Sequence, residues 1–336
     1  MKPSKYLYPL SFVYLFVFNI VQRIKARSRK KLPCKVISVG NITAGGTGKT
    51  PTVIYLAKML KSAGRKVCVV SRGYKRQSGN AAVGVVSDGR RIVMGKKLAG
   101  DEPYLIAQAL KNVPVLVDKI RYRAGEYAVK NFAADIVILD DGFQHAGLRR
   151  DLDILCINAL NPFGNGMLLP AGYLREPVKN ISRAGIFIIT RCDRVPEEKT
   201  AEIENTIKSR VKDAKIFHAF FSKKIFYRNE EVDAASFKDK NIIAVSGIAL
   251  PEDFDITLKE LGANILLHKK FPDHHFFKDN DIRGFLQSAA ESQAAILTTS
   301  KDAGRMPEDF PCYIIDVRLE IKESAEFKKT VEAYLD

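Results

Sequence analysis

The chain has 336 residues, of which 46% are hydrophobic and 27% charged, and its formal net charge is +16 at pH 7. This composition excludes a disordered chain, and the length is sufficient for two domains. The positive charge predicts an anionic partner, which could be nucleic acid, an anionic membrane surface or a phosphorylated substrate. Basic clusters rich in aromatic residues are not obvious, so we do not expect nucleic acid to be the partner.

The first 34 residues differ from the rest of the chain. An uncharged, aromatic-rich run of about sixteen residues, shorter than the roughly 20 that a spanning helix needs, occupies 6–21. A basic segment follows it, where a secretory signal would carry a small-residue cleavage site. We predict a membrane-associated helix with its basic flank on anionic headgroups. A core helix packed on the domain is the alternative.

From residue 35 to 222, short apolar runs alternate with helical patterns, as in a doubly wound, mostly parallel sheet. The run 136–139 has no polar residue and should be buried on both faces. A hairpin with an Asp-Gly turn is predicted at 83–94. The expected strands are 35–40, 67–70, 83–86, 91–94, 114–117, 136–139, 154–157 and 186–189, and the expected helices are 50–62, 102–110 and 121–131.

Beyond this region the pattern is interrupted. Residues 223–240 are mixed, polar and basic, and we predict a connector there. A second, smaller α/β domain is predicted for 241–336, with strands at 242–245, 265–268, 295–299 and 313–316. The five cysteines form no C-x-x-C pair, which favours a reducing compartment over disulfides or a metal site; they are Cys34, Cys68, Cys156, Cys192 and Cys312.

The stretch 40–51 reads GNITAGGTGKTP and lies between a predicted strand and a predicted helix. That context is typical of a phosphate-binding loop, although Thr43 stands where the strict G-x-x-x-x-G-K-T pattern has glycine. Glycines let successive N–H groups converge on phosphate oxygens, and a lysine can reach the terminal phosphates. The predicted nucleotide-binding residues are Gly45, Gly46, Thr47, Gly48, Lys49, Thr50 and Pro51.

Two adjacent acids, Asp140 and Asp141, follow the apolar strand at 136–139. Together with the Thr50 hydroxyl they are predicted to hold Mg²⁺, as the acid at this strand end does in phosphate-loop enzymes. For Asp141, capping of the following turn is the alternative. His145 could orient an aspartate or a phosphate, although a lone histidine is more often structural.

Several motifs together resemble the tetraacyldisaccharide 4'-kinase family of lipid A biosynthesis. DDGFQH and GDEP, following this form of loop, carry most of the resemblance. The matching stretches are VGNITAGGTGKTP (39–51), SRGYKR (71–76), GDEP (100–103), DDGFQH (140–145), LLPAGYLREP (168–177), FPDHH (271–275) and TTSKDAGR (298–305).

This resemblance implies a phosphate-loop kinase fold and Mg²⁺-ATP-dependent phosphorylation of the 4'-hydroxyl of an acylated glucosamine disaccharide 1-phosphate, giving lipid IVA. It also implies a monotopic enzyme on the cytoplasmic face of the inner membrane. Asp101 would be the base, assisted by His274, which the resemblance favours over His275. Lys49 would neutralise the terminal phosphates while Asp141 helps to hold Mg²⁺.

Four residues are predicted to contact the substrate: Arg72, Tyr74, Arg175 and Glu176. Arginine binds phosphate through its planar fork. Lys75 and Arg76 could equally form a solvated basic face. Thr190-Arg191-Cys192-Asp193 ends another strand and loosely resembles the guanine-reading motif of GTPases, so we expect the nucleotide base near it.

Two other classes of function are considered. A ParA/MinD-like ATPase switch is the first alternative, because the A-G-G-T-G-K-T core resembles the loops of those ATPases. They carry an additional lysine where this chain has Ala44, which disfavours a switch. A non-catalytic membrane adaptor fits poorly with the retained Lys49, Asp101 and Asp140. No obligate protein partner is evident.

Overall fold

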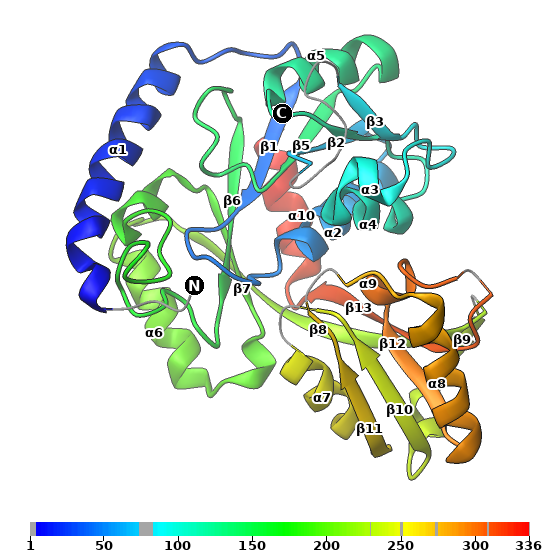
Figure 1. Cartoon of the computed structure of the whole chain (residues 1–336). Helices are drawn as coiled ribbons and strands as arrows, with labels where there is room; N and C mark the ends of the chain where they lie inside the picture. The colour runs from blue at the N-terminus through cyan, green and yellow to red at the C-terminus, as the bar shows by residue number, and fades with distance from the viewer. Residues whose placement is uncertain are drawn as a thin grey trace. The chain divides into compact units, whose positions relative to one another are not determined.

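The structure is a computed structural model that describes residues 5–73, 83–228, 230–248, 251–272, 275–307 and 309–335. The chain divides into two compact units (Figure 1). Unit 1 comprises Met1–Phe221 and Leu319–Asp336, and unit 2 comprises Ser222–Arg318. The predicted division differs from this one, because the last segment of the chain returns to unit 1.

Unit 1 is built on a sheet with the strand order β3-β4-β2-β5-β1-β6-β7-β8. All neighbouring strands are parallel except β3 and β4. The strands are β1 Lys35–Gly40, β2 Val67–Ser71, β3 Gly84–Ser87, β4 Val115–Val117, β5 Ile136–Asp140, β6 Leu152–Asn158, β7 Ile186–Thr190 and the first half of β8 Lys215–Tyr227.

Helices cover both faces of this sheet, which confirms the doubly wound prediction. Alternate residues of β1 point to opposite faces, so that Ile37 packs in one core cluster and Val36 in another. One face is covered by α2, α4 and α10, and the other by α5 and α6. The helices are α1 Tyr8–Arg27, α2 Lys49–Ser62, α3 Lys96–Ala99, α4 Asp101–Ala109, α5 Arg121–Phe132, α6 Glu197–Lys208 and α10 Ser324–Ala333.

Two local predictions were wrong. The second strand of the hairpin, 91–94, is reduced to an isolated bridge between Ser87 and Ile92, and in the turn the Asp88 carboxylate accepts from the N–H groups of Arg90 and Arg91. The connector at 223–240 contains the second half of β8, strand β9 Glu230–Val232 and a 3-10 turn at Ala234–Phe237. Most side chains of β8 and β9 are only partly buried or exposed, so their sequence mixes polar with apolar residues and did not indicate strands.

Unit 2 has the strand order β11-β10-β12-β13-β8, with β9 antiparallel to β8. Its helices pack on both faces, since Phe254 and Phe285 belong to separate core clusters. The remaining elements are β10 Asn241–Ser246, α7 Pro251–Glu260, β11 Asn264–Lys270, α8 Asp279–Glu291, β12 Ala295–Thr299, α9 Ser300–Ala303 and β13 Tyr313–Ile321.

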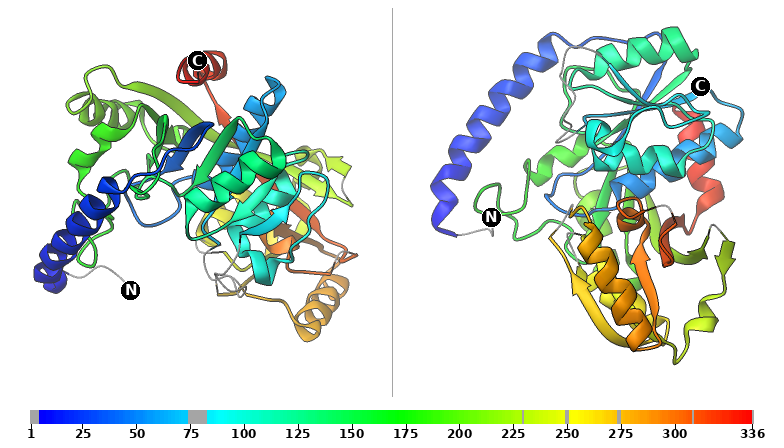
Figure 2. Two further views of the ribbon diagram at one scale, coloured as in Figure 1. Left: turned by 90° about the horizontal axis from the view of Figure 1, so that it is seen from above. Right: turned by 45° about the vertical axis from the view of Figure 1, so that its right-hand side comes forward.

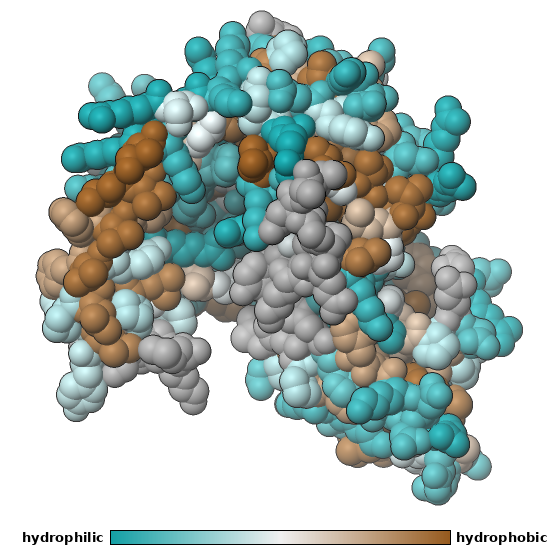
Figure 3. Space-filling view, turned by 45° about the horizontal axis from the view of Figure 1, so that its top comes forward, coloured by the Kyte–Doolittle hydropathy of each residue, from teal (hydrophilic) through white to brown (hydrophobic). Residues whose placement is uncertain are grey.

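The N-terminal helix α1 lies along the flank of unit 1 (Figure 2). Its outward side is apolar and exposed, and Figure 3 shows these side chains as a brown band. Within the described residues, no helix is long and apolar enough to cross a bilayer. We call this outward side the outer face of α1; it consists of Leu10, Val13, Phe16, Val17, Ile20 and Ile24.

Candidate functional site

The loop between β1 and α2 has the backbone that phosphate binding requires. Gly45 and Gly48 have φ values of 118° and 84°, which side chains with a Cβ rarely adopt. A Cβ added at Gly45 or Gly46 would meet nothing within 4 Å, so the loop faces open space. A Cβ at Gly40 would lie 2.5 Å from the Phe143 Cβ, so glycine is needed there for close packing.

Thr43 is buried and pairs with Leu174 in an isolated bridge. The neighbouring Ala44 N–H donates to the Tyr173 carbonyl at 2.7 Å, and the Arg175 N–H donates to the Ile42 carbonyl at 2.7 Å. This segment therefore has extended pairing, which any residue can adopt. The pairing explains why the loop tolerates threonine where the strict pattern has glycine.

The other side of the loop is held by the ends of β6 and β7. Thr190 Oγ1 donates to the Thr47 carbonyl at 3.2 Å. The Gly46 carbonyl accepts from Asn158 Nδ2 at 3.2 Å and from Arg191 Nη1 at 3.1 Å. The Thr190–Asp193 segment, where we expect the nucleotide base, thus contacts the loop through its first two residues.

Asp140 and Asp141 have opposite electrostatic environments. Asp140 ends β5 and is buried; burial, together with the charges of Glu102 and Asp141, raises its pKa to about 7. Ser71 Oγ donates to Asp140 Oδ2 at 2.9 Å. Burial also favours the neutral form of Asp141, but the charges of Lys49 and Arg175 outweigh it and hold the pKa of that carboxyl below its usual range.

Two cations hold Asp141 directly. Lys49 Nζ lies 3.7 Å from Asp141 Oδ1, and Arg175 Nη1 lies 3.1 and 2.9 Å from the two carboxylate oxygens. The structure therefore brings together three predicted site residues from the phosphate loop, the DDGFQH motif and the LREP motif.

The donor chemistry here suits Mg²⁺. Asp140, Asp141 and the Thr50 hydroxyl at the start of α2 all offer oxygen, which Mg²⁺ prefers. Burial and then the charges of Glu102 and Asp141 raise the pKa of Asp140, and a divalent cation would offset this cost of ionising it. Among the residues that the structure describes, no group of three or more His, Cys, Asp or Glu could hold a metal alone. Such a site would use one or two carboxylates together with phosphate oxygens, as Mg²⁺ sites often do.

Asp101 is the first residue of α4. Gly100, with φ 92° and ψ 157°, turns the chain between α3 and α4. Lys96 Nζ lies 3.6 Å from Asp101 Oδ1, and both side chains are largely buried. Because Glu102 raises the pKa of Asp140, the start of α4 lies within electrostatic range of the acid pair. Sequence reasoning missed the Lys96 contact, since nothing in the GDEP motif indicates it.

A cavity of about 400 Å³ lies beside Asp141. His145 lines it, and burial, followed by the charges of Arg121 and Lys25, lowers its pKa to about 4. His145 is therefore neutral at pH 7. The predicted site residue Arg72 also lines the cavity. The buried Arg121 lines it as well and was not predicted as a site residue. The full lining is Tyr14, Phe18, Gln22, Lys25, Arg72, Lys119, Arg121, Asp141, Gln144, His145, Leu169 and Arg175.

Glu176, predicted to contact substrate, is completely buried. Its carboxylate accepts from Gln144 Nε2 at 2.7 Å, Asn180 Nδ2 at 2.9 Å and Arg183 Nη2 at 3.0 Å. In this arrangement Glu176 positions the Gln144 side chain and has no surface to offer a ligand. Arg183, which also lies 4.3 Å over the Phe143 ring, carried no recognisable sequence signal.

Some predicted residues lie outside the described part of the chain. These are Tyr74 and His274, together with Lys75 and Arg76. His275 is described: its Nε2 lies 3.2 Å from Asp281 Oδ2, and its ring stacks on Phe271 at 4.5 Å. These contacts hold the His275 ring within unit 2.

Comparison with known proteins covers almost the whole chain. A family model described as "LpxK: Tetraacyldisaccharide-1-P 4'-kinase" matches residues 3–336. A curated protein named tetraacyldisaccharide 4'-kinase from Halothermothrix orenii is 38% identical over 328 residues, which are 90% of this chain and 85% of that protein. One of the same name from Syntrophus aciditrophicus is 38% identical over 315 residues, covering 90% and 84% of the two chains.

A solved structure has the same fold. It is described as the "apo" form of LpxK from Aquifex aeolicus in complex with ATP, with 33% identity, a TM-score of 0.82 and 98% of each chain covered.

Proposed function

The chain belongs to the tetraacyldisaccharide-1-P 4'-kinase family, and on that premise we propose that it phosphorylates the 4'-hydroxyl of an acylated glucosamine disaccharide 1-phosphate with ATP, giving lipid IVA. The observation that carries this function is the set of contacts joining Lys49, Asp141 and Arg175 beside the open phosphate loop. It combines a nucleotide-binding loop, metal-binding acids and an arginine that can grip an anionic substrate.

The loop N–H groups of Gly45–Thr50 bind the ATP phosphates, and Lys49 neutralises the terminal ones. Asp140, Asp141 and the Thr50 hydroxyl hold Mg²⁺, which, when bound, offsets the charge on the transferred group. Lys49 Nζ already lies 3.7 Å from Asp141 Oδ1, so the lysine and this carboxylate need little rearrangement to act on the same phosphate and metal.

Asp101 accepts the proton of the attacking sugar hydroxyl. Asp101 is the first residue of α4, so the positive end of the helix dipole and Lys96 both lie beside its carboxylate. His274 assists this base. Neutral His145 and Arg72 line the cavity that would receive the disaccharide.

The enzyme acts on the cytoplasmic face of the inner membrane. The outer face of α1 supports this location, since Phe16 and Ile24 expose 67% and 61% of their surface on the same side of one helix. Arg27, a basic residue in the last turn of α1, would lie on anionic headgroups. A soluble helix would normally bury such a face.

Transfer of ³²P from [γ-³²P]ATP to purified disaccharide 1-phosphate in detergent tests the function. We expect the parent to label the lipid and Asp101→Asn to label it at least about 100-fold more slowly, since general-base catalysis contributes about 10²–10⁴-fold, while ATP binding is retained. Asp213→Asn changes an exposed acid of unit 1 and is the matched control. ATP hydrolysis by the parent without lipid labelling would instead favour the ATPase switch.

A further inference from the structure

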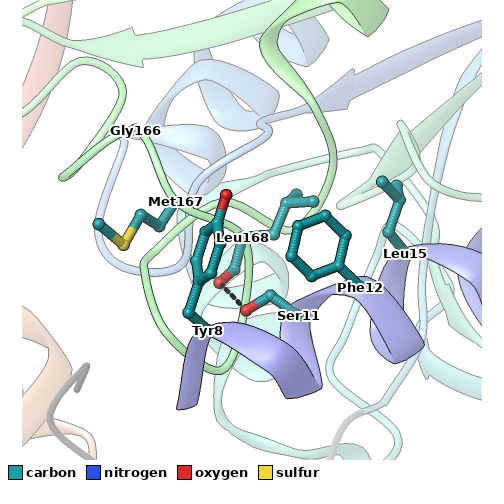
Figure 4. Close-up of a pocket in the computed structure, with 7 residues that line it drawn as sticks. All are labelled: Tyr8, Ser11, Phe12, Leu15, Gly166, Met167 and Leu168. Carbon is teal, nitrogen blue, oxygen red and sulfur yellow. Dashed lines mark hydrogen bonds between the residues drawn. The ribbon is translucent and has the colours of Figure 1, made fainter. Parts of the chain in front are cut away.

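The inner face of α1 donates hydrogen bonds to the main chain of the site. Ser11 Oγ donates to the Leu168 carbonyl at 2.9 Å, the contact drawn as a dashed line in Figure 4. Tyr14 OH donates to the Arg175 carbonyl at 2.7 Å, and Gln22 Nε2 donates to the Gln144 carbonyl at 2.9 Å. The acceptors lie in the two segments that carry the LLPAGYLREP and DDGFQH motifs.

Arg175 connects the α1 contacts to the phosphate loop and to Asp141. Its carbonyl accepts from Tyr14, its N–H donates to the Ile42 carbonyl beside the phosphate loop, and its guanidinium grips Asp141. One residue thereby connects α1, the loop and the acid pair. A shift of the Arg175 backbone would move all three contacts together.

Gln144 provides a second, parallel connection. Its carbonyl accepts from Gln22, while its side chain donates to the Asn41 carbonyl at 2.7 Å and to Glu176 at 2.7 Å. Asn41 is the second residue of the loop stretch GNITAGGTGKTP. The inner face of α1 is therefore connected to the first part of the loop stretch, at Asn41 through Gln144 and at Ile42 through Arg175.

The Tyr14 hydroxyl is suited to a permanent contact. Burial raises its pKa above the usual range for tyrosine, with the Arg175 charge opposing and the Glu176 charge adding to this shift. The phenol therefore remains a donor at physiological pH. Tyr14, Gln22 and Lys25 also line the cavity beside Asp141, so α1 forms one wall of it.

We propose that Tyr14 and Gln22 are positioning residues for phosphoryl transfer, through which the seating of α1 on unit 1 fixes Arg175 and Gln144. This inference rests on the proposed function. The same helix carries the outer face on its opposite side, so attachment to a lipid surface and alignment of the site belong to one rigid element. A helix that served only as an anchor would need no donors aimed at the main chain of the catalytic motifs.

The test compares Tyr14→Phe with Tyr8→Phe, which removes the same hydroxyl from a half-exposed tyrosine of the same helix. We expect Tyr14→Phe to lower kcat by about 3- to 10-fold, in keeping with the usual effect of one neutral hydrogen bond. The KM for ATP and the fraction bound to vesicles of phosphatidylethanolamine and phosphatidylglycerol should be unchanged. Tyr8→Phe should match the parent in all three measurements.

Hydrogen exchange supplies a readout that does not depend on catalysis. In the full chain with Tyr14→Phe, amides in the 168–176 segment should exchange about 3- to 10-fold faster than in the parent. Gln22→Met should have the same effect on 141–146. If the parent labels no lipid, the proposed function fails while exchange still tests the positioning.

Parental kcat in Tyr14→Phe, in a parent that labels the lipid, would overturn the inference. So would unchanged exchange in 168–176. If Tyr14→Phe instead lost vesicle binding in proportion to activity, α1 would be an anchor alone and the inference would also be wrong.

Discussion

The two neighbouring carboxyl groups at the end of β5 have pKa values that their surroundings shift in opposite directions. Asp141 is held ionised by Lys49 and Arg175, whereas Asp140, buried against Ser71, has a pKa of about 7. Asp141 is thus a fixed anion that can keep Lys49 and Arg175 in place. Asp140 is only partly ionised near pH 7, and a bound cation would favour its fully ionised form.

The partly buried His145 makes the stability of the fold depend on pH. Its folded-state pKa of about 4 lies below the ordinary 6.5, so between these pH values the unfolded chain binds more protons. The native state therefore loses stability as pH falls from 6.5 towards 4. Urea unfolding should show a smaller loss in His145→Gln over this range, and the difference between the two proteins should be constant above pH 7.5. Parallel curves over the whole range would contradict the assignment.

At the scale of elements, the buried parallel strands could be predicted because they read as unbroken apolar runs. The ends of all predicted strands and helices before residue 190 lie within two residues of the observed ones, apart from 91–94. β8 was missed, because only three of its side chains are buried and the polar residues 222–224 interrupt its apolar ones. The contacts of Lys96, Glu102 and Arg183 could not be predicted, since they join segments far apart in sequence or depend on a turn.

The outer face of α1 gives a prediction for membrane attachment. Phe16→Gln combined with Ile20→Gln should lower the fraction bound to anionic vesicles by at least about tenfold, because each buried apolar side chain contributes about 1.5–3 kcal/mol. Flotation with vesicles measures it. Ile256→Gln alters an exposed isoleucine of α7 and is the control. Equal flotation of the parent and the double variant would show that this face does not enter the bilayer.

His218 gives a prediction for the packing of three elements. Its ring lies between Glu204 of α6, at 2.9 Å, and Glu323 before α10, at 3.1 Å. Hydrogen bonds to charged groups contribute about 1.5–3 kcal/mol, so His218→Leu should reduce the free energy of unfolding by about that amount at pH 7. Burial raises the pKa of Glu204, but its contacts with Lys208 and His218 outweigh burial, so the pKa is lowered overall. Burial likewise raises the pKa of Glu323, and its hydrogen bonds with His218 outweigh this effect.

The sign of the pH dependence follows from these lowered values. Both carboxyls are stabilised as anions in the fold, so their contribution is present above the ordinary pKa of 4.5 and is lost as pH falls below it. Denaturant titration of His218→Leu and the parent should therefore converge below pH 4. A difference that is the same at pH 4 and pH 7 would contradict this account.

Considering the molecule as a whole, unit 2 has a buried ion pair of its own. In unit 2, Arg305 and Asp302 form an ion pair with both side chains fully buried, and both bond to Gly247 at the end of β10. Asp302→Asn removes the negative partner, which should cost unit 2 about 3–5 kcal/mol. Calorimetry should show that unit 2 of the variant melts at a lower temperature than in the parent, while titration with ATP should still show binding to unit 1. Asp309→Asn, at an exposed acid, is the control, and loss of ATP binding would contradict this separation.

The return of the chain to unit 1 has a consequence for biogenesis. Phe327 and Val331 of α10 are completely buried, and the Phe327 ring lies 5.1 Å from Phe217 and 6.0 Å from Tyr55 on the phosphate-loop helix. The whole of unit 2 is translated before this segment leaves the ribosome. A nascent chain that stalls before residue 319 would therefore display an unfinished apolar surface beside its nucleotide loop, and chaperones and proteases should recognise it.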